Sequence, residues 1–359
     1  MKKPYIASGR INLIGEHLDY NGGLVLPTTI DLGISLWAKN HPDQFVFYSD
    51  KHESFIFSNK EEFPNEHGWF QYPLSVLRYL KDQNIPLPNG LELIYRSNLP
   101  EGSGLSSSAA ILVVTLKAFN KILHLNWSEL DIAKIAQWIE NQYIGVKCGI
   151  MDSYVIAHNL WDSALLIDCN QLKHEVIPLS IVENYKFLIL DTCLPRSLKH
   201  SEYNERRKSC EKALSIIQNY KKLDFLAEAS VEDLKVLKDE LLYKRAYHVV
   251  TEQERVKKAA NYLRQNDFFA FGQLMNESHN SLKNFYEVSC EQLDFLVDMI
   301  RNFEGCLGAR MTGAGFGGCA IALIDQSFDL ETIPKIIHDY FQKFAIQPKI
   351  FVGKEKCGF

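Results

Sequence analysis

Residues 9–23, GRINLIGEHLDYNGG, form the first of three segments that could do chemistry. Apolar residues lead directly into a cluster of Glu16, His17, Asp19 and Asn21. Such a loop can present several donors and acceptors at once, which a polyhydroxylated ligand needs once water is excluded. A metal site and a solvated turn are the alternatives, although the spacing matches no standard zinc pattern.

The second segment is LPEGSGLSSSAA, residues 99–110. It follows an expected strand and precedes an apolar run that is long enough for a helix. Glycines let a backbone approach a ligand closely, and the N–H groups and dipole of a helix start favour phosphate. No Gly-Lys-Ser/Thr follows, so the charge of a triphosphate would have to be met by backbone amides and Mg²⁺. An ordinary turn with a serine N-cap is the alternative.

The third segment is ARMTGAGFGGC, residues 309–319, which holds four glycines within six residues. It leads into an expected strand that begins at Cys319. A glycine-rich loop alone is more typical of a tight turn than of a ligand site.

Two acids and three histidines outside these segments are further candidates for a functional role. Asp152 stands in an otherwise apolar stretch, and Glu140 precedes it by twelve residues, at the edge of the apolar face of an expected helix. An acid in such surroundings needs a partner or a function, and a structural salt bridge remains an open alternative. His158, His200 and His248 show no metal or triad spacing, so we expect them to be structural or on the surface.

The composition is that of a folded globular protein. The 359 residues include 39 Lys plus Arg and 44 Asp plus Glu, a formal charge of −5, and 46% are hydrophobic. A mildly acidic chain is a poor nucleic-acid binder, and no stretch approaches the ~20 apolar residues of a membrane span. The start lacks the apolar core of a signal peptide, and eight scattered cysteines indicate reduced cytoplasmic thiols.

Helices and strands are expected to mix in both halves of the chain, without strict βαβ alternation. Apolar spacing predicts helices over 69–81, 128–143 and 329–344, the second with a capping box at its start, and charged helices over 204–222 and 231–247. The expected strands are 33–38, 45–48, 91–96, 164–168, 186–191, 319–325 and 349–352. We expect an α+β protein of two domains, with a crossing near 178–185.

Together, the three segments resemble the motifs of the GHMP family of small-molecule kinases, and within it the galactokinase family. The resemblance runs from residue 9 to about 325. Further stretches carry it: CGIMD at 148–152, LIDC at 166–169, SEYNERRKSC at 201–210, RAYHVVTE at 245–252 and SHNSLKNFYEVSCEQLD at 278–294.

This resemblance implies a role for each matching residue. Asp152 is expected to be the general base that receives the proton of the anomeric hydroxyl, with Arg10 as its partner and transition-state stabiliser. Ser108 and Glu140 are expected to hold Mg²⁺. The sugar is expected to contact Glu16, His17, Asp19, Gly149 and Tyr203. The phosphates of ATP are expected to lie on Gly102, Ser103, Gly104, Leu105, Ser106, Ser107 and Ser108.

The resemblance also implies a fold and a reaction. Residues 1–180 would form a domain like the second domain of ribosomal protein S5, residues 181–359 a ferredoxin-like domain, and the active site would lie in the interdomain cleft. The γ-phosphoryl of ATP would pass to the C1 hydroxyl of α-D-galactose, giving galactose 1-phosphate and ADP. We expect a cytoplasmic monomer that binds galactose and ATP and engages neither nucleic acid nor membrane.

Some residues depart from the family pattern. Leu18 stands where Thr is usual, Ser153 and Tyr154 where Gln and Phe are usual, and Arg196 where His is common. None of these removes a chemical group, but they leave the preferred sugar open. The alternatives are a related sugar 1-kinase, such as one for N-acetylgalactosamine, and a non-catalytic sugar and ATP sensor. The EHxD cluster argues against a mevalonate-type kinase.

Overall fold

The computed structural model describes residues 3–58, 62–64, 68–100, 102–179, 184–194 and 199–352, and for 199 and 200 the backbone alone. The chain forms two compact units that are both discontinuous in sequence. The first unit contains Met1–Arg10, Thr29–Pro100 and Ser106–Asn159, and the second contains Ile11–Thr28, Glu101–Leu105 and Leu160–Phe359. The expected division into continuous domains at residue 180 stays a prediction, and 180–183 lie outside the described residues.

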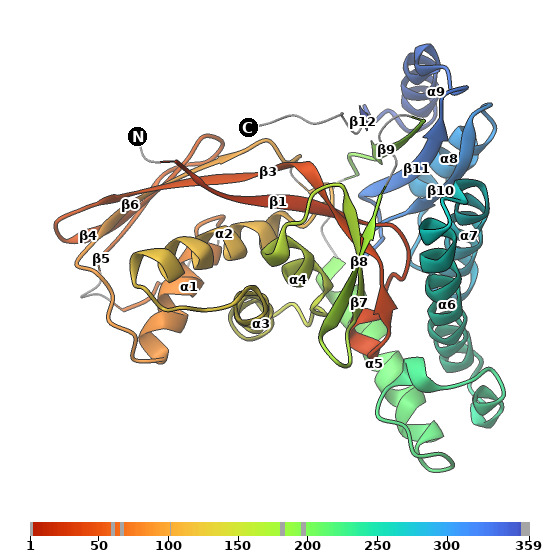
Figure 1. Cartoon of the computed structure of the whole chain (residues 1–359), viewed down its shortest axis with the longest axis horizontal. Coiled ribbons are helices and arrows are strands. Elements are labelled where there is room, and N and C mark those ends of the chain that lie inside the picture. Colours follow the sequence, from red (N-terminus) through yellow and green to blue (C-terminus); the bar gives the residue numbers. More distant parts are fainter. Residues whose placement is uncertain are drawn as a thin grey trace. The chain divides into compact units, whose positions relative to one another are not determined.

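A sheet forms one layer of the first unit (Figure 1). Strand β6 pairs antiparallel with β3 and parallel with β4, which continues into a hairpin with β5, and β1 pairs with β3. In β6, Leu91, Leu93 and Tyr95 alternate with less buried residues, so one face of the strand enters the core. The strands are β1 (Tyr5–Asn12), β3 (Pro27–Asn40), β4 (Gln44–Ser49), β5 (Phe55–Ser58) and β6 (Leu91–Ser97).

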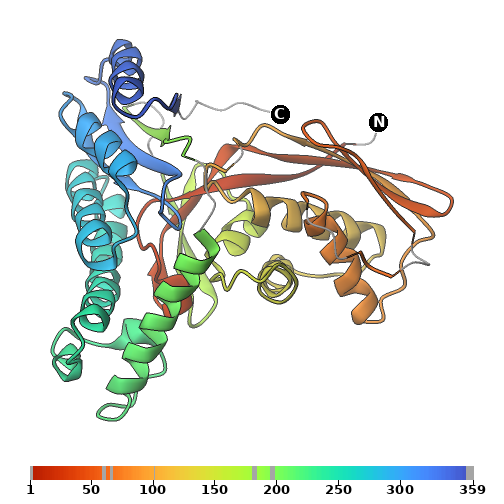
Figure 2. The same cartoon turned by 180° about the vertical axis from the view of Figure 1, so that it is seen from behind.

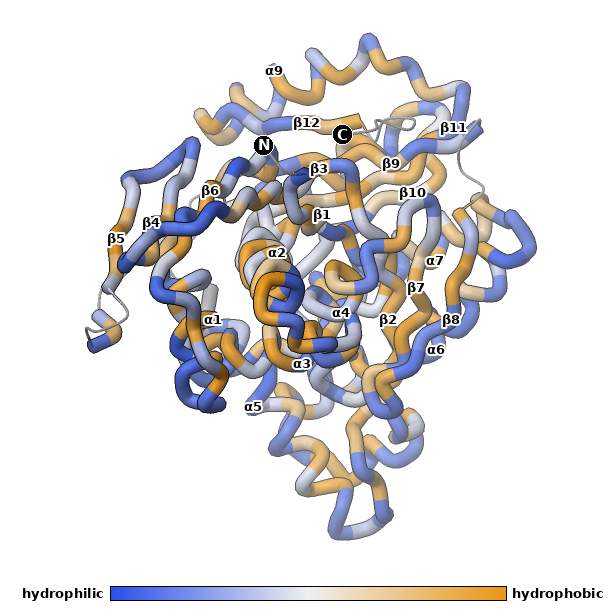
Figure 3. The backbone as a smooth tube through the Cα atoms, turned by 60° about the vertical axis from the view of Figure 1, so that its left-hand side comes forward, coloured by the Kyte–Doolittle hydropathy of each residue, from blue (hydrophilic) through white to orange (hydrophobic). Residues whose placement is uncertain are grey.

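In the described residues of this unit, helices α1 to α4 form the other layer and lie on one face of the sheet (Figure 1). Helix α2 is the central one, because its sequence is apolar on nearly every side (Figure 3) and most of its residues are buried. The predicted capping box of α3 is confirmed, with Ser128 and Asp131 bonded reciprocally. The helices are α1 (Gln71–Asp82), α2 (Ser107–Ile122), α3 (Glu129–Ile139) and α4 (Met151–His158).

In the second unit, an antiparallel sheet of order β10-β11-β9-β12 carries helices against it (Figure 2). Strand β11 is buried along almost its whole length, which fits an inner strand covered on both faces. The elements are β9 (Tyr185–Asp191), β10 (Cys306–Met311), β11 (Cys319–Asp325), β12 (Lys349–Val352), α7 (Phe268–Ser281), α8 (Glu291–Arg301) and α9 (Ile333–Phe344).

The remaining elements of the second unit are a β-hairpin with a short partner strand and two long helices. They are β2 (Leu24–Val25), β7 (Ser163–Asp168), β8 (Lys173–Pro178), α5 (Lys199–Ile217) and α6 (Glu240–Arg264). Within the described ranges, no helix is long and apolar enough to cross a bilayer. Single helical turns occur in both units at Asp19–Asn21, Glu140–Ile144, Leu226–Glu228, Asp233–Val236, Leu282–Tyr286 and Leu330–Thr332.

The prediction of a helix over 231–247 is wrong at the start of that range. Residues Asp233–Val236 form only a 3₁₀ turn, and α6 begins at Glu240. The reason is local, because the Asp239 carboxylate accepts the backbone N–H groups of Leu241 and Leu242 and so caps the helix at that point. Six of the seven predicted strands and the helices over 69–81, 128–143 and 329–344 are confirmed to within a few residues, and the strand predicted over 33–38 is part of the longer β3, which begins at Pro27.

Helix α7 and strand β10 approach each other through two glycines. A Cβ placed on Gly308 would lie 2.0 Å from the carbonyl oxygen of Gly272, and one on Gly272 would lie 2.5 Å from that of Leu307. Backbone atoms cannot move aside as a flexible side chain can. The packing of α7 on the sheet therefore requires glycine at both positions.

We expect Gly308→Ala to lower the free energy of unfolding by about 1–3 kcal/mol, because the added methyl overpacks this contact. Urea unfolding followed by circular dichroism measures the loss. Gly102→Ala is the comparison, since its Cβ meets nothing within 4 Å and only the backbone conformation, φ +68°, is strained. An equal or smaller loss for Gly308→Ala than for Gly102→Ala would contradict the packing argument.

Candidate active site

The structure brings Arg10 of β1 and Asp152 of α4 together in the first unit. The guanidinium donates from Nε to Oδ1 at 2.7 Å and from Nη2 to Oδ2 at 2.5 Å. The Arg10 side chain is 5% exposed and that of Asp152 30%. A bidentate pair of this kind fixes the plane of the carboxylate, and the partial exposure leaves the acid accessible to a ligand.

Glu140 lies in the same unit and is held by neutral groups. Ser108 Oγ donates to its Oε1 at 2.8 Å, and Cys148 Sγ lies 3.4 Å from its Oε2. Burial raises the pKa of Glu140 and the charge of Asp152 adds to the rise, while the Ser108 hydrogen bond opposes it. The π-helical turn Glu140–Ile144 that follows α3 positions this carboxylate.

These two groups fit the predicted role of holding Mg²⁺. A hydroxyl and a carboxylate oxygen are hard ligands, and a buried acid that accepts hydrogen bonds from neutral groups would be stabilised by a cation. In the described part of the chain, no three His, Cys, Asp or Glu side chains cluster as a complete metal site. In proteins, Mg²⁺ usually takes one or two protein ligands and fills the rest of its coordination sphere with phosphate oxygens and water.

The predicted phosphate loop has an unusual backbone. Gly102, Gly104 and Ser106 all adopt left-handed φ values, of 68°, 81° and 65°. Ser106 is the N-cap residue of α2, but its side chain makes no capping hydrogen bond. The amide groups at the start of α2 are therefore not capped by this side chain, which suits the predicted phosphate binding.

In the second unit, Glu16 joins the first sequence segment to the third. Its carboxylate is 1% exposed and ion-paired with Arg310 of β10. It also accepts from Asn12 Nδ2 at 2.9 Å, from the Gly313 amide at 2.9 Å and from Thr312 Oγ1 at 3.2 Å. Burial raises the pKa of Glu16 and Arg310 opposes the rise. Both carboxylate oxygens are engaged by protein groups, and sugar contact by Glu16 stays a prediction.

Glu252 of α6 attaches the same segment to two helices. Its Oε1 accepts from the Gly15 amide at 3.0 Å and from Ser278 Oγ at 2.6 Å, and its Oε2 accepts from Arg255 at 2.6 Å. Burial alone would raise the pKa of Glu252, but the charge of Arg255, with lesser contributions from other groups, lowers it to about 2.

His248, one turn before Glu252, is fully buried, so of the two predicted possibilities, structural or on the surface, the surface one is excluded. Its ring contacts the Glu16 carbonyl oxygen and Ser281 Oγ, and burial lowers its pKa to about 4. Sequence reasoning missed the contribution of Glu252 and Arg310. The available signal was that Arg245, His248 and Glu252 lie on one face of α6. A helix face made of polar residues is normally interpreted as solvent-exposed, so this signal was not used.

His17 begins a chain of hydrogen bonds in the second unit that leads to the buried side chains of Tyr286 and Cys210. Its Nδ1 lies 2.7 Å from Tyr20 Oη, which lies 2.8 Å from Tyr286 Oη, which lies 3.1 Å from Cys210 Sγ. Burial lowers the pKa of His17 well below its usual value. A neutral imidazole has one donor and one acceptor nitrogen, and this chain occupies one of them.

Of the other predicted sugar residues, Tyr203 lies near this imidazole. The ring of Tyr203, on α5, lies 5.5 Å from that of His17, and Asp19 follows two residues after His17. The Asp19 carboxylate is half-buried and accepts from the Tyr20 amide at 3.0 Å. Gly149 belongs to the first unit, where it is buried in the loop before α4.

The residues that depart from the family pattern are buried where the structure describes them. Leu18, Ser153 and Tyr154 are 0%, 3% and 2% exposed. They therefore act on their surroundings through packing rather than as an exposed ligand surface. Arg196 lies outside the described residues.

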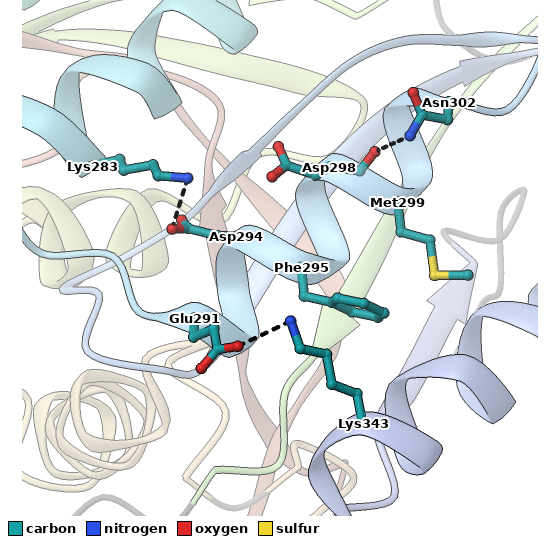
Figure 4. A pocket seen from close by; sticks show the side chains of 8 residues that line it. All are labelled: Lys283, Glu291, Asp294, Phe295, Asp298, Met299, Asn302 and Lys343. Carbon is teal, nitrogen blue, oxygen red and sulfur yellow. Dashed lines mark hydrogen bonds and ion pairs between the residues drawn. The ribbon is translucent and has the colours of Figure 1, made fainter.

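A pocket of about 530 Å³ on α8 and α9 is a separate feature of the second unit (Figure 4). Its charged groups are already paired, Lys283 with Asp294 at 3.0 Å and Lys343 with Glu291 at 2.9 Å. None of the predicted site residues lines it.

Comparison with known proteins agrees with this arrangement. Family models match at residues 71–159 (GHMP kinases N terminal domain), 259–343 (GHMP kinases C terminal) and 3–39 (Galactokinase galactose-binding signature). The galactokinase of Clostridium beijerinckii is 38% identical over 99% of this chain and 94% of its own length. That of Fusobacterium nucleatum is 37% identical, over 97% and 92%.

The chain belongs to the galactokinase family of GHMP kinases. It is therefore an ATP-dependent sugar kinase, and the predicted fold class is confirmed. Lactococcus lactis galactokinase, solved with galactose, superposes with a TM-score of 0.91 at 35% identity, covering 98% of this chain and 93% of that one. Methanococcus jannaschii mevalonate kinase, at a TM-score of 0.67 and 24% identity over 97% of this chain and 96% of its own, shares the fold.

We expect Arg310→Met to lower the free energy of unfolding by about 3–5 kcal/mol, because it leaves Glu16 charged and unpaired in the interior. Chemical denaturation at neutral pH measures the change. Arg264→Met is the matched control, since Arg264 is 38% exposed and pairs with Glu175 on the surface, where such a pair contributes about 1 kcal/mol at most. Equal losses in the two variants would contradict a stabilising role for the buried pair.

Proposed function

We propose that this chain transfers the γ-phosphoryl group of ATP to the C1 hydroxyl of α-D-galactose, giving galactose 1-phosphate and ADP. The observation that carries the proposal is the bidentate Arg10–Asp152 pair, with its half-exposed acid, in a member of the galactokinase family. The galactose bound to the Lactococcus lactis relative supports the choice of sugar.

Asp152 receives the proton of the C1 hydroxyl, and Arg10 orients the acid. The transition state of phosphoryl transfer is loose, so the hydroxyl need not be deprotonated early and a carboxylate is a sufficient base. The guanidinium of Arg10 also lends positive charge to the transferring group. Positioning and charge stabilisation thus supply most of the rate.

The residues at the start of α2 bind the nucleotide phosphates through backbone amides, as a helix start does for anions. Ser108 and Glu140 would hold Mg²⁺, which would neutralise charge on the phosphates.

His17, Asp19 and Tyr203 hold the sugar hydroxyls, and Asp19 or Tyr203 reads the axial C4 hydroxyl that distinguishes galactose from glucose. A monomeric state and a location in the cytoplasm remain predictions from the sequence.

A sugar panel tests the proposed function directly. Purified protein with Mg-ATP is assayed for ADP release with galactose, glucose, N-acetylgalactosamine and mevalonate, and ³¹P NMR identifies the phosphorylated position. We expect galactose to give the highest kcat/KM and a C1 phosphate. Preference for N-acetylgalactosamine, or no ADP release with any sugar, would overturn the proposal in favour of one of the two alternatives.

Asp152→Asn should cut turnover by at least ~100-fold and leave nucleotide binding intact, because the amide keeps the shape of the acid but cannot take the proton. Steady-state kinetics and calorimetric titration with ATP separate the two effects. Asp298→Asn, an exposed acid on α8, is the control and should turn over normally. Near-normal turnover of the Asp152 variant would remove the base from this position.

Asp19→Ala should reduce the preference for galactose over glucose by about 10-fold, since a hydroxyl left without its partner costs ~1–3 kcal/mol. The ratio of kcat/KM for the two sugars reports this. Asp43→Ala, an exposed acid between β3 and β4, is the control. An unchanged ratio would contradict a contact of Asp19 with the C4 hydroxyl and would leave Tyr203 as the proposed contact.

A further inference from the structure

Ser106 has a backbone conformation that its residue type does not favour. It sits at φ +65° and ψ +41°, in the left-handed region, directly before α2. A side chain with a Cβ is strained there, and glycine would adopt the same conformation without strain. Strain that persists in a folded protein must be offset by interactions of the residue concerned, and it concentrates at functional sites.

The hydroxyl of Ser106 is not used to cap α2. A serine in the N-cap position normally accepts a backbone N–H of the first turn, and this is why serine is favoured there. Ser106 makes no such hydrogen bond. Serine at this position is therefore strained in its backbone, unlike glycine, and it does not stabilise the helix start as a capping serine does.

The same hydroxyl instead donates to Asp152. Ser106 Oγ lies 2.5 Å from Asp152 Oδ2, and Ser106 itself is 7% exposed. The Oδ2 atom also accepts from Arg10 Nη2, whereas among the described residues Oδ1 accepts from Arg10 Nε alone. Each carboxylate oxygen has two lone-pair sites. Oδ2 is thus fully used, and Oδ1 retains one acceptor site.

We propose that Ser106 is a positioning residue that occupies Oδ2 of Asp152 and so leaves Oδ1 as the atom that receives the substrate proton. The proposal rests on the proposed function. As the C1 oxygen bonds to the γ-phosphorus, the bond from phosphorus to the leaving oxygen breaks and its electron pair stays on ADP. The proton moves from the C1 hydroxyl to Oδ1 and is later released to solvent.

This role goes beyond that of a phosphate-loop serine. A serine that only shapes the turn could be replaced by glycine without loss, because glycine satisfies the left-handed backbone. A serine that only binds phosphate would, when removed, weaken the affinity for ATP. A serine that positions the base affects the phosphoryl-transfer step and leaves ATP binding nearly unchanged.

The test compares Ser106→Gly with Ser106→Ala. Both variants lack the hydroxyl, but only alanine keeps the backbone strain. We expect kcat with galactose to fall by at least about 10-fold in both variants, as for loss of a hydrogen bond to a charged group. The dissociation constant of ATP should change by no more than about twofold, and the glycine variant should melt at a higher temperature than the alanine variant.

Asn84 provides a matched control. It also has a left-handed backbone, φ +54°, but lies exposed after α1. Asn84→Gly should likewise melt above Asn84→Ala, and both should keep the wild-type kcat. This separates the effect of backbone strain from the effect of the hydroxyl.

Wild-type kcat in Ser106→Gly would overturn the proposal, as would a loss confined to ATP affinity. If the wild-type protein prefers another sugar, the proposed function fails, while the same comparison on that sugar still decides the role of Ser106. A wild-type protein inactive on every sugar would overturn both.

Discussion

The pairing of Arg10 with Asp152 is the interaction on which the chemistry of this protein depends. The two residues are 142 positions apart, so a strand and a helix of the first unit must both form before the guanidinium can meet the carboxylate. Two parallel hydrogen bonds set the plane of the acid, and Ser106 adds a third on one oxygen. A base whose free lone pair has a fixed direction accelerates the reaction more than a freely rotating one, because reacting atoms must meet within a narrow range of distance and angle.

Hydrogen bonds also fix the buried acids of the second unit, but there they surround the whole carboxylate. Glu16 and Glu252 are withdrawn from water, and each is surrounded by a nearly complete set of donors. Such networks are costly when incomplete, so they specify one arrangement of the first and third glycine-rich segments. The acids that the resemblance assigns to the site thus differ in their exposure to solvent. Asp152 and Asp19 are partly exposed, whereas Glu16 is buried.

Much of this could be predicted from the sequence, and the rest could not for physical reasons. Local patterns identified the glycine-rich segments, the capping box at Ser128 and the inner strands, because these depend on neighbours in the chain. The start of α6 was misplaced, since a single cap at Asp239 outweighed a longer charged pattern. Arg310 and Glu252 went unnoticed because a charged residue reads as solvent-exposed unless its distant partner is known. Resemblance paired Arg10 with Asp152, but the Ser106 contact required the fold.

The fold is shared with mevalonate kinases, so side chains rather than architecture decide what this chain acts on. A double-mutant cycle on Arg10→Met and Asp152→Asn, read as the single-turnover rate of phosphoryl transfer from Mg-ATP to galactose, tests most directly whether the pair acts as a unit. We predict that each single variant slows the step by ~100-fold or more and that the double variant is little slower than the slower single one. Losses that multiply in the double variant, or a near-normal rate for Arg10→Met, would contradict this account.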